Sequence, residues 1–364
     1  MTHQPPSSWD IFTNSGTPRP SDAYWPEIPP LRRRRHPASS SPPLEIPHDP
    51  ASEALNARGA SFRLPPGADG ERVRMAVNAA IHLRRPLLVT GDPGVGKTSL
   101  AYAIAWELGL GPVLRWPITP RSQLVEHGLF QYDAIARVQD ANVLRPSAEQ
   151  RAVSKEQVVD ASNGVADYIK LGPVGTAYLP YRRPRVLLID EIDKADIQLP
   201  YELLDVLEEG FYEIPPLQRE ARRMAKATPR RVRTADPDGW AEVLEGQVQC
   251  TEFPIVVMTS NGERDFPAAF HRRCIRVRMP KPVKADVLME QVLAHFEDRD
   301  VAAAAQEEVN EFLQRSAKDC LAVDQLLHAL HLLTLDAATP PSAEERDVLR
   351  EILYRDLKRS DDGA

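Results

Sequence analysis

The sequence predicts an α/β fold in which a parallel β-sheet lies between layers of helices and is followed by a small all-helical domain. Continuous apolar runs, typical of strands buried on both faces, occur at 185–189 and 253–259, and a shorter run occurs at 86–90. Segments with apolar residues at helical spacing separate these runs, and such alternation favours a parallel, doubly wound sheet. From residue 284 onward the pattern is helical throughout.

The remaining elements follow from local patterns in the same way. We expect helices at 71–85 and 98–109 and strands at 113–117 and 274–279. The C-terminal region divides into four amphipathic segments, at 284–297, 302–316, 323–336 and 342–358. Ser342 and Glu345 form a capping box for the last of these helices. The change of pattern at the prolines of 280–282 predicts a core domain at 61–282 and a helical lid domain at 283–364.

The first 60 residues predict a proline-rich and largely disordered tail. Residues 1–70 hold 14 of the 34 prolines, together with a run of four arginines at 32–35. Such a segment buries too little apolar surface to offset the entropy of ordering it. The tail also carries aromatic and apolar residues that disordered tails usually lack, among them Trp9, Ile11 and Phe12. These residues either form a motif that binds a partner or folds back on the body, or they are incidental.

Composition and charge exclude several classes of protein. The 364 residues carry a net charge of −7, which makes a general nucleic-acid binder a poor expectation. Three widely spaced cysteines exclude a disulfide scaffold and a cysteine-based zinc site. No apolar run approaches the ~20 residues of a membrane helix, and no secretory signal is visible. The prediction is a cytoplasmic protein with no membrane partner.

A glycine-rich loop at 91–98 follows the first predicted strand. It reads Gly91-Asp92-Pro93-Gly94-Val95-Gly96-Lys97-Thr98 and is followed by Ser99, which matches the phosphate-binding pattern G-x-x-x-x-G-K-[ST]. The glycines let several N–H groups point at one phosphate, and the helix that starts at Lys97 adds the positive end of its dipole. Lys97 is expected to reach the β- and γ-phosphates, and the Thr98 hydroxyl is expected to ligate Mg²⁺.

Polar residues follow the two long apolar runs. Asp190 and Glu191 end the first run, where Asp190 would hold Mg²⁺ and Glu191 would act as general base on the attacking water. Asn261 ends the second run and is expected to contact the γ-phosphate and the lytic water. Arg273, with Arg272 as second choice, precedes the last strand and is expected to reach the nucleotide of a neighbouring subunit.

The order of phosphate loop, Asp-Glu strand, sensor Asn, arginine and helical lid resembles the AAA+ ATPases, a class of P-loop NTPases. The resemblance is closer to the bacterial MoxR family, whose sequences are similar in the segments at 91–98, 187–196, 203–210, 255–261 and 270–274. This resemblance covers roughly residues 70–335. It implies an ATP-bound ring of six subunits, with ATPase activity and chaperone-like work on a partner, often one with a von Willebrand factor A domain. The implied cofactors are ATP and Mg²⁺.

Two departures and one shorter resemblance qualify this expectation. Lys97 and Asp190 lie 93 residues apart, which predicts an insertion around 132–180. The lid stretch at 321–327 lacks the arginine that many relatives place near the γ-phosphate, and Lys318 is a weak substitute. The residues 9–12, followed by 29–32, resemble an N-terminal motif of some MoxR-like ATPases of bacterial conflict systems. This resemblance implies that the ATPase works together with other components that such a system encodes.

Alternative functions stay open at this point. Residues 219–233 hold seven basic side chains and one acid, which indicates either contact with an acidic peptide or nucleic-acid substrate or a solvated, flexible loop. The segment has no aromatic residue, which argues against base stacking there. A nucleic-acid-dependent ATPase and a slow nucleotide switch or scaffold are therefore the alternatives to a remodelling ATPase.

Overall fold

The computed structural model describes most of the chain. The described residues are 9–20, 24–30, 32, 43–48, 56, 59–143, 164–224, 227–281, 285, 288–289, 292, 301–316, 321–333 and 342–354. The sequence-based statements on Arg33–Arg35, Lys318 and the part of the insertion at 144–163 lie outside these residues.

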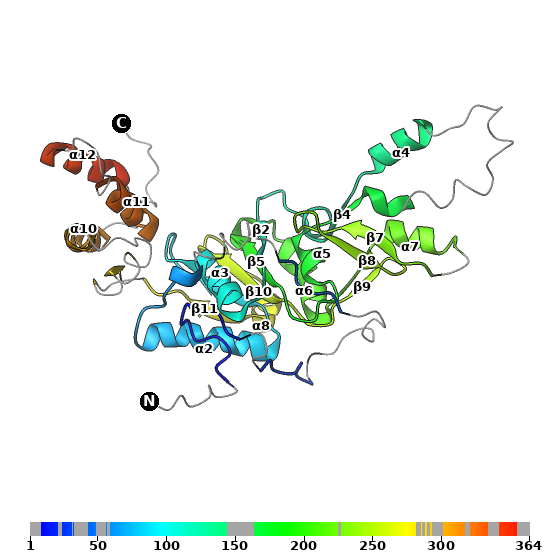
Figure 1. Cartoon of the computed structure of the whole chain (residues 1–364), viewed down its shortest axis with the longest axis horizontal. Helices are drawn as coiled ribbons and strands as arrows, with labels where there is room; N and C mark the ends of the chain where they lie inside the picture. Colours follow the sequence, from blue (N-terminus) through cyan, green and yellow to red (C-terminus); the bar gives the residue numbers. More distant parts are fainter. Residues whose placement is uncertain are drawn as a thin grey trace.

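A five-stranded parallel sheet forms the centre of the molecule (Figure 1). Its strands are β1 (Leu87–Thr90), β2 (Leu114–Pro117), β5 (Val186–Asp190), β10 (Ile255–Ser260) and β11 (Ile275–Arg278), in the spatial order β11-β1-β10-β5-β2. The register pairs Leu87 with Val257 and Ile275, and Ile189 with Met258. The carboxyl ends of β1, β5 and β10 therefore meet at one edge.

Helices cover both faces of this sheet, as the apolar strands require. Side chains that alternate along β1, β5 and β10 pack on one face against α2 (Ala68–Leu83) and α3 (Lys97–Leu108). The other set packs against α5 (Pro173–Ala177) and α6 (Leu199–Glu209). Burial of both faces explains why β5 and β10 are apolar up to the polar residues at their carboxyl ends. The predicted fold class, a parallel sheet between helices, is confirmed.

The region between β2 and β5 and the region between α6 and β10 build a second sheet, which the sequence did not predict. Its order is β3-β4-β7-β8, with β3 at Phe130–Tyr132, β4 at Ile169–Leu171, β7 at Arg230–Arg233 and β8 at Trp240–Val243. Around it lie η1 (Leu124–Leu129), α4 (Ala134–Val143), η3 (Gly164–Tyr168), α7 (Pro215–Ala221) and the hairpin of β6 (Phe211–Glu213) with β9 (Gln247–Gln249). In the basic segment at 219–233, α7 and β7 replace part of the expected loop.

In the core, η4 (Ile192–Lys194) follows β5, and α8 (Ala268–Arg273) precedes β11. The C-terminal region contains α10 (Val301–Ser316), α11 (Val323–Leu333) and α12 (Ala343–Leu353). These three helices have an apolar core of their own and lie at one end of the molecule, while the second sheet lies at the other (Figure 1). The capping box of Ser342 and Glu345 is present at the start of α12. None of the helices in the described part of the chain combines the length and apolarity needed to cross a bilayer.

Candidate functional site

The loop between β1 and α3 has a backbone that only glycine tolerates well. Gly94 and Gly96 lie in the left-handed region, with φ of 73° and 87°. A Cβ at Gly94 would lie 2.0 Å from that of Ala322, and one at Gly96 would lie 2.9 Å from the ring of Phe62. These glycines therefore allow the lid and the segment before α2 to approach the loop closely.

Lys97 is the first residue of α3, and its ammonium points back into the loop. The side chain is buried, and Nζ donates hydrogen bonds to the carbonyl oxygens of Gly91 and Asp92 at 2.8 Å and 2.7 Å. Burial lowers the pKa of Lys97, while the carboxylates of Asp193 and Asp92 oppose this shift. An anionic phosphate oxygen is a stronger acceptor than these neutral carbonyls. The buried cation at a helix N-terminus therefore fits a phosphate group.

A cavity of about 450 Å³ opens beside this loop. Cavities of this size hold small organic ligands. Four parts of the chain line it: the loop and the start of α3, the segment at 61–65, the residues 279–280 after β11, and the start of α11 with Val323, Asp324 and Leu327. The N–H of Val323 lies 3.5 Å from the carbonyl oxygen of Gly94. Core, lid and the segment before α2 thus meet around the phosphate loop, where Val95, Thr98 and Ser99 also face the cavity.

The carboxylate of Asp190 lies at the end of β5 and joins three other elements. Its Oδ1 accepts hydrogen bonds from the hydroxyls of Thr98 at 3.0 Å and Thr259 at 2.7 Å. Its Oδ2 accepts from Arg115 Nη2 at 2.6 Å and Nε at 3.1 Å. Thr98 and Asp190, which are 92 residues apart in the sequence, are thus in direct contact. A hydroxyl and a carboxylate oxygen side by side are ligands that fit Mg²⁺.

Glu191 adopts an unusual backbone conformation directly after this strand. Its φ is 61°, and its N–H donates to the Thr259 hydroxyl at 2.8 Å. Its Oε2 accepts from Lys194 Nζ at 2.7 Å, and this hydrogen bond raises the pKa of Lys194. Both side chains of the pair are about two-fifths exposed, so the ion pair is weak and easily exchanged. The Glu191 carboxylate therefore remains available to a water molecule at this edge.

Asn261 follows β10 at the same edge and is held through its backbone. The buried carboxylate of Asp193 accepts at Oδ2 from the N–H groups of Asn261 and Glu263, at 2.8 Å and 3.1 Å. Its other oxygen, Oδ1, is buried and has no hydrogen-bond partner among the described residues. Asp193 thus ties the turn after β5 to the tip of β10 and fixes Asn261 relative to Glu191.

Arg272 and Arg273 lie at the amino ends of the strands, opposite the carboxyl ends where Asp190 and Asn261 lie. They end α8, directly before β11, and Ile275 of β11 pairs with Leu87 at the start of β1. The phosphate loop follows the other end of β1, about 10 Å further along the strand. Arg273 forms an ion pair with Glu208 of α6, while the side chain of Arg272 is exposed. The structure therefore does not bring either arginine to the chain's own phosphate loop.

The sequence analysis missed four residues that shape this site: Arg115, Asp193, Lys194 and Thr259. Thr259 had a signal, because a threonine at the end of a buried apolar strand needs a hydrogen-bond partner. Arg115 had none, because only the pairing of β2 with β5 places it beside Asp190. Asp193 and Lys194 were visible as charged residues after β5, but the sequence did not show which partner each would meet.

Comparisons with known proteins find a matching family model and similar solved structures. Residues 87–199 match the model of the ATPase family associated with various cellular activities (AAA). No curated protein matches the chain. Among solved structures, NtrX from Brucella abortus in complex with ADP is similar at 14% identity with a TM-score of 0.40, over 83% of this chain and 58% of that one. A second structure of NtrX from Brucella abortus is similar at 14% identity with a TM-score of 0.41, over 80% and 55%.

The chain spans a little more than half the length of these solved structures. The matched family segment begins at β1 and ends where α6 begins, so it contains the phosphate loop, the acidic end of β5 and the first two strands of the second sheet. Residues 87–199 thus match an AAA ATPase family domain, and part of the central parallel sheet lies within them.

Proposed function

We propose that this protein is an AAA+ ATPase that hydrolyses ATP and uses the energy to remodel a protein partner. The observation that carries the proposal is the meeting of Thr98, Asp190 and Thr259 at one sheet edge, beside the glycine loop with its buried Lys97. A phosphate cradle, a metal-binding oxygen pair and a nearby carboxylate are the parts that nucleotide hydrolysis needs.

Each residue has a defined part in this proposal. The loop N–H groups and Lys97 bind the phosphates, and Thr98 with Asp190 would hold Mg²⁺, which neutralises phosphate charge when bound. Glu191 orients the attacking water and accepts its proton, and Asn261 contacts the γ-phosphate. Binding of labelled ATP together with release of inorganic phosphate tests the proposal. A protein that binds ATP and releases no phosphate, alone or with candidate partners, would be a switch or scaffold instead.

The proposed assembly is a ring of subunits. Arg272 and Arg273 lie at the sheet edge away from their own phosphate loop, which suits a role at the nucleotide of a neighbouring subunit in a ring. The resemblance to the MoxR family supports a hexamer, a chaperone-like role and a partner with a von Willebrand factor A domain. The family model that matches the chain is broader than MoxR, so these finer assignments rest on the resemblance.

We expect the Arg273→Ala variant to bind ATP normally and to lose at least about 10-fold in turnover, because an arginine at the transition state stabilises its developing charge. Mixing this variant with Lys97→Ala protein should restore part of the rate, since one subunit then supplies the arginine and the other supplies the nucleotide. Phosphate release from the mixture is the measurement. Arg272→Ala serves as the comparison, and absence of rescue in a mixture shown to co-assemble contradicts a role in trans.

A specific observation favours a second candidate, a nucleic-acid-dependent ATPase. The guanidinium groups of Arg231 and Arg233 lie 4.8 Å and 5.1 Å from the ring centroid of Trp240, which is 38% exposed. The basic segment has no aromatic residue of its own, but the neighbouring strand β8 supplies an aromatic ring for base stacking. Stimulation of ATP hydrolysis by single-stranded DNA or RNA, lost in Trp240→Ala, would favour this candidate.

A further inference from the structure

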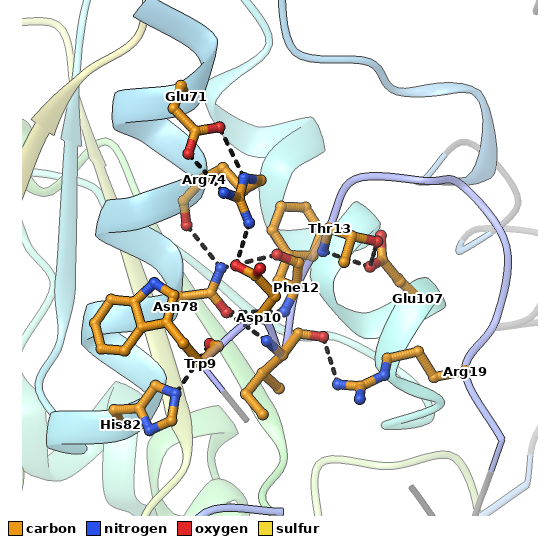
Figure 2. A network of polar contacts seen from close by, with 11 residues as sticks. Trp9, Asp10, Phe12, Thr13, Arg19, Glu71, Arg74, Asn78, His82 and Glu107 are labelled. Carbon is orange, nitrogen blue, oxygen red and sulfur yellow. Dashed lines mark hydrogen bonds and ion pairs between the residues drawn. The ribbon is translucent and has the colours of Figure 1, made fainter. Parts of the chain in front are cut away.

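Residues 9–19 near the N-terminus, here called the strap, are bound to α2 and α3 on the outside of the core (Figure 2). Ile11 and Phe12 are buried and belong to the same apolar cluster as α2, α3 and β1. Trp9 stacks on His82 of α2, with ring centroids 4.8 Å apart and an angle of 3° between the planes. Of the alternatives that the sequence left open for these residues, the one in which the segment folds back on the body matches these contacts.

Two buried polar side chains hold the backbone of the strap. Asn78 of α2 accepts at Oδ1 from the N–H groups of Ile11 and Phe12, at 2.8 Å and 2.9 Å, and donates to the Phe12 carbonyl oxygen at 2.8 Å. Glu107 of α3 accepts from the N–H and hydroxyl of Thr13 at 2.6 Å and 2.7 Å. A buried amide and a buried carboxylate are costly without partners. The strap supplies those partners, so this face of α2 and α3 is built to receive it.

Asn14 connects the strap to the nucleotide cavity. Its φ of 60° turns the chain, and its amide forms a pair of hydrogen bonds with one backbone segment. Nδ2 donates to the carbonyl oxygen of Phe62 at 3.1 Å, and Oδ1 accepts from the N–H of Leu64 at 2.5 Å. Ser61, Phe62, Arg63 and Pro65 line the cavity, and the Phe62 ring lies against Gly96 of the phosphate loop.

We propose that Asn14 positions the 61–65 wall of the nucleotide cavity, so that docking of the strap and binding of nucleotide stabilise each other. The inference rests on the proposed function, because it needs the cavity to bind a nucleotide. When the strap is docked, the Asn14 amide holds Phe62 and Leu64 in the arrangement that closes the cavity. By linkage, nucleotide that presses on this wall must in turn stabilise the docked strap by the same factor. A partner that removed the strap would weaken nucleotide binding.

The test compares Asn14→Gly with Ser15→Ala. Glycine tolerates the positive φ at this position and removes both amide hydrogen bonds, whereas the Ser15 hydroxyl contacts only Thr17 among the described residues. We expect Asn14→Gly to raise the Kd for ADP roughly 10-fold, because the loss of two modest hydrogen bonds lowers the population with the strap docked, and Ser15→Ala to leave it unchanged. Calorimetric titration of the full-length proteins with ADP gives both constants.

Hydrogen exchange supplies a second readout that needs no nucleotide turnover. In the wild-type protein, ADP should slow exchange of the backbone amides at 11–15, and Asn14→Gly should abolish that slowing. The coupling would be overturned if Asn14→Gly and wild type bind ADP with equal affinity and ADP does not change hydrogen exchange of the amides at 11–15. That result would leave the proposed function intact. A wild-type protein that binds neither ADP nor ATP would overturn both.

Discussion

The Glu191→Gln variant should bind ATP with wild-type affinity and hydrolyse it about 10²- to 10⁴-fold more slowly, the range that removal of a general base produces. The amide keeps the size of the side chain but cannot accept the proton of the attacking water. Among the described residues the carboxylate contacts one side chain, that of Lys194, and it is 43% exposed, so its loss should not unfold the domain. Phosphate release at saturating ATP, measured beside equilibrium binding, separates the two effects.

Glu263→Gln is the matched control for this experiment. Glu263 lies at the same sheet edge and is exposed, and its backbone N–H rather than its carboxylate contacts Asp193. The control should therefore keep wild-type turnover. If Glu191→Gln also turns over at the wild-type rate, the general base lies elsewhere and the assignment of Glu191 is wrong.

The Lys97→Ala variant should lose nucleotide binding, with an affinity at least about 100-fold weaker than that of the wild type. The buried ammonium is the strongest donor in the loop, and charge-assisted hydrogen bonds to phosphate contribute about 1.5–3 kcal/mol each. Its two hydrogen-bond acceptors are the neutral carbonyls of Gly91 and Asp92. Removing the ammonium from these two contacts therefore leaves no buried carboxylate without a partner. Titration with a fluorescent ATP analogue measures the change.

Lys281→Ala is the control for charge alone. Its ammonium lies 3.0 Å from the Asp92 carboxylate of the same loop, but the side chain is 49% exposed. Removing this exposed charge should change affinity far less than removing Lys97. Comparable losses in the two variants would mean that the loop attracts nucleotide by its general charge and that Lys97 has no special contact with phosphate.

The sequence predicted the parts of the fold in which burial produces a local run of apolar residues. β5 and β10 are apolar up to their polar carboxyl ends because both faces are covered, and the phosphate loop follows β1 as its pattern requires. The predicted bounds of α3 and of the five strands of the central sheet differ from the structure by no more than about two residues, the usual uncertainty of element ends. The second sheet was missed because its strands are short and partly exposed, as in β8 with its alternating burial.

Contacts between distant segments explain what the sequence could not predict in the site and the strap. Arg115 meets Asp190 only because β2 pairs with β5, and strand order is not visible in a local pattern. Asn78 and Glu107 read as ordinary polar positions on helices, yet they hold the backbone of residues more than 60 positions earlier. A composition rich in proline predicts disorder for 1–60 on average, while burial of Ile11 and Phe12, together with the hydrogen bonds to Asn78 and Glu107, anchors one stretch of it.

The most direct test of the account is the rate of ATP hydrolysis per subunit, measured against protein concentration with Glu191→Gln as the blank. An AAA+ ATPase whose sites are completed by an arginine of the neighbouring subunit should show a per-subunit rate that rises with concentration and then levels off as rings form. A rate that never exceeds the Glu191→Gln blank, at any concentration and with ATP shown to be bound, would contradict the claim that this chain is an ATPase.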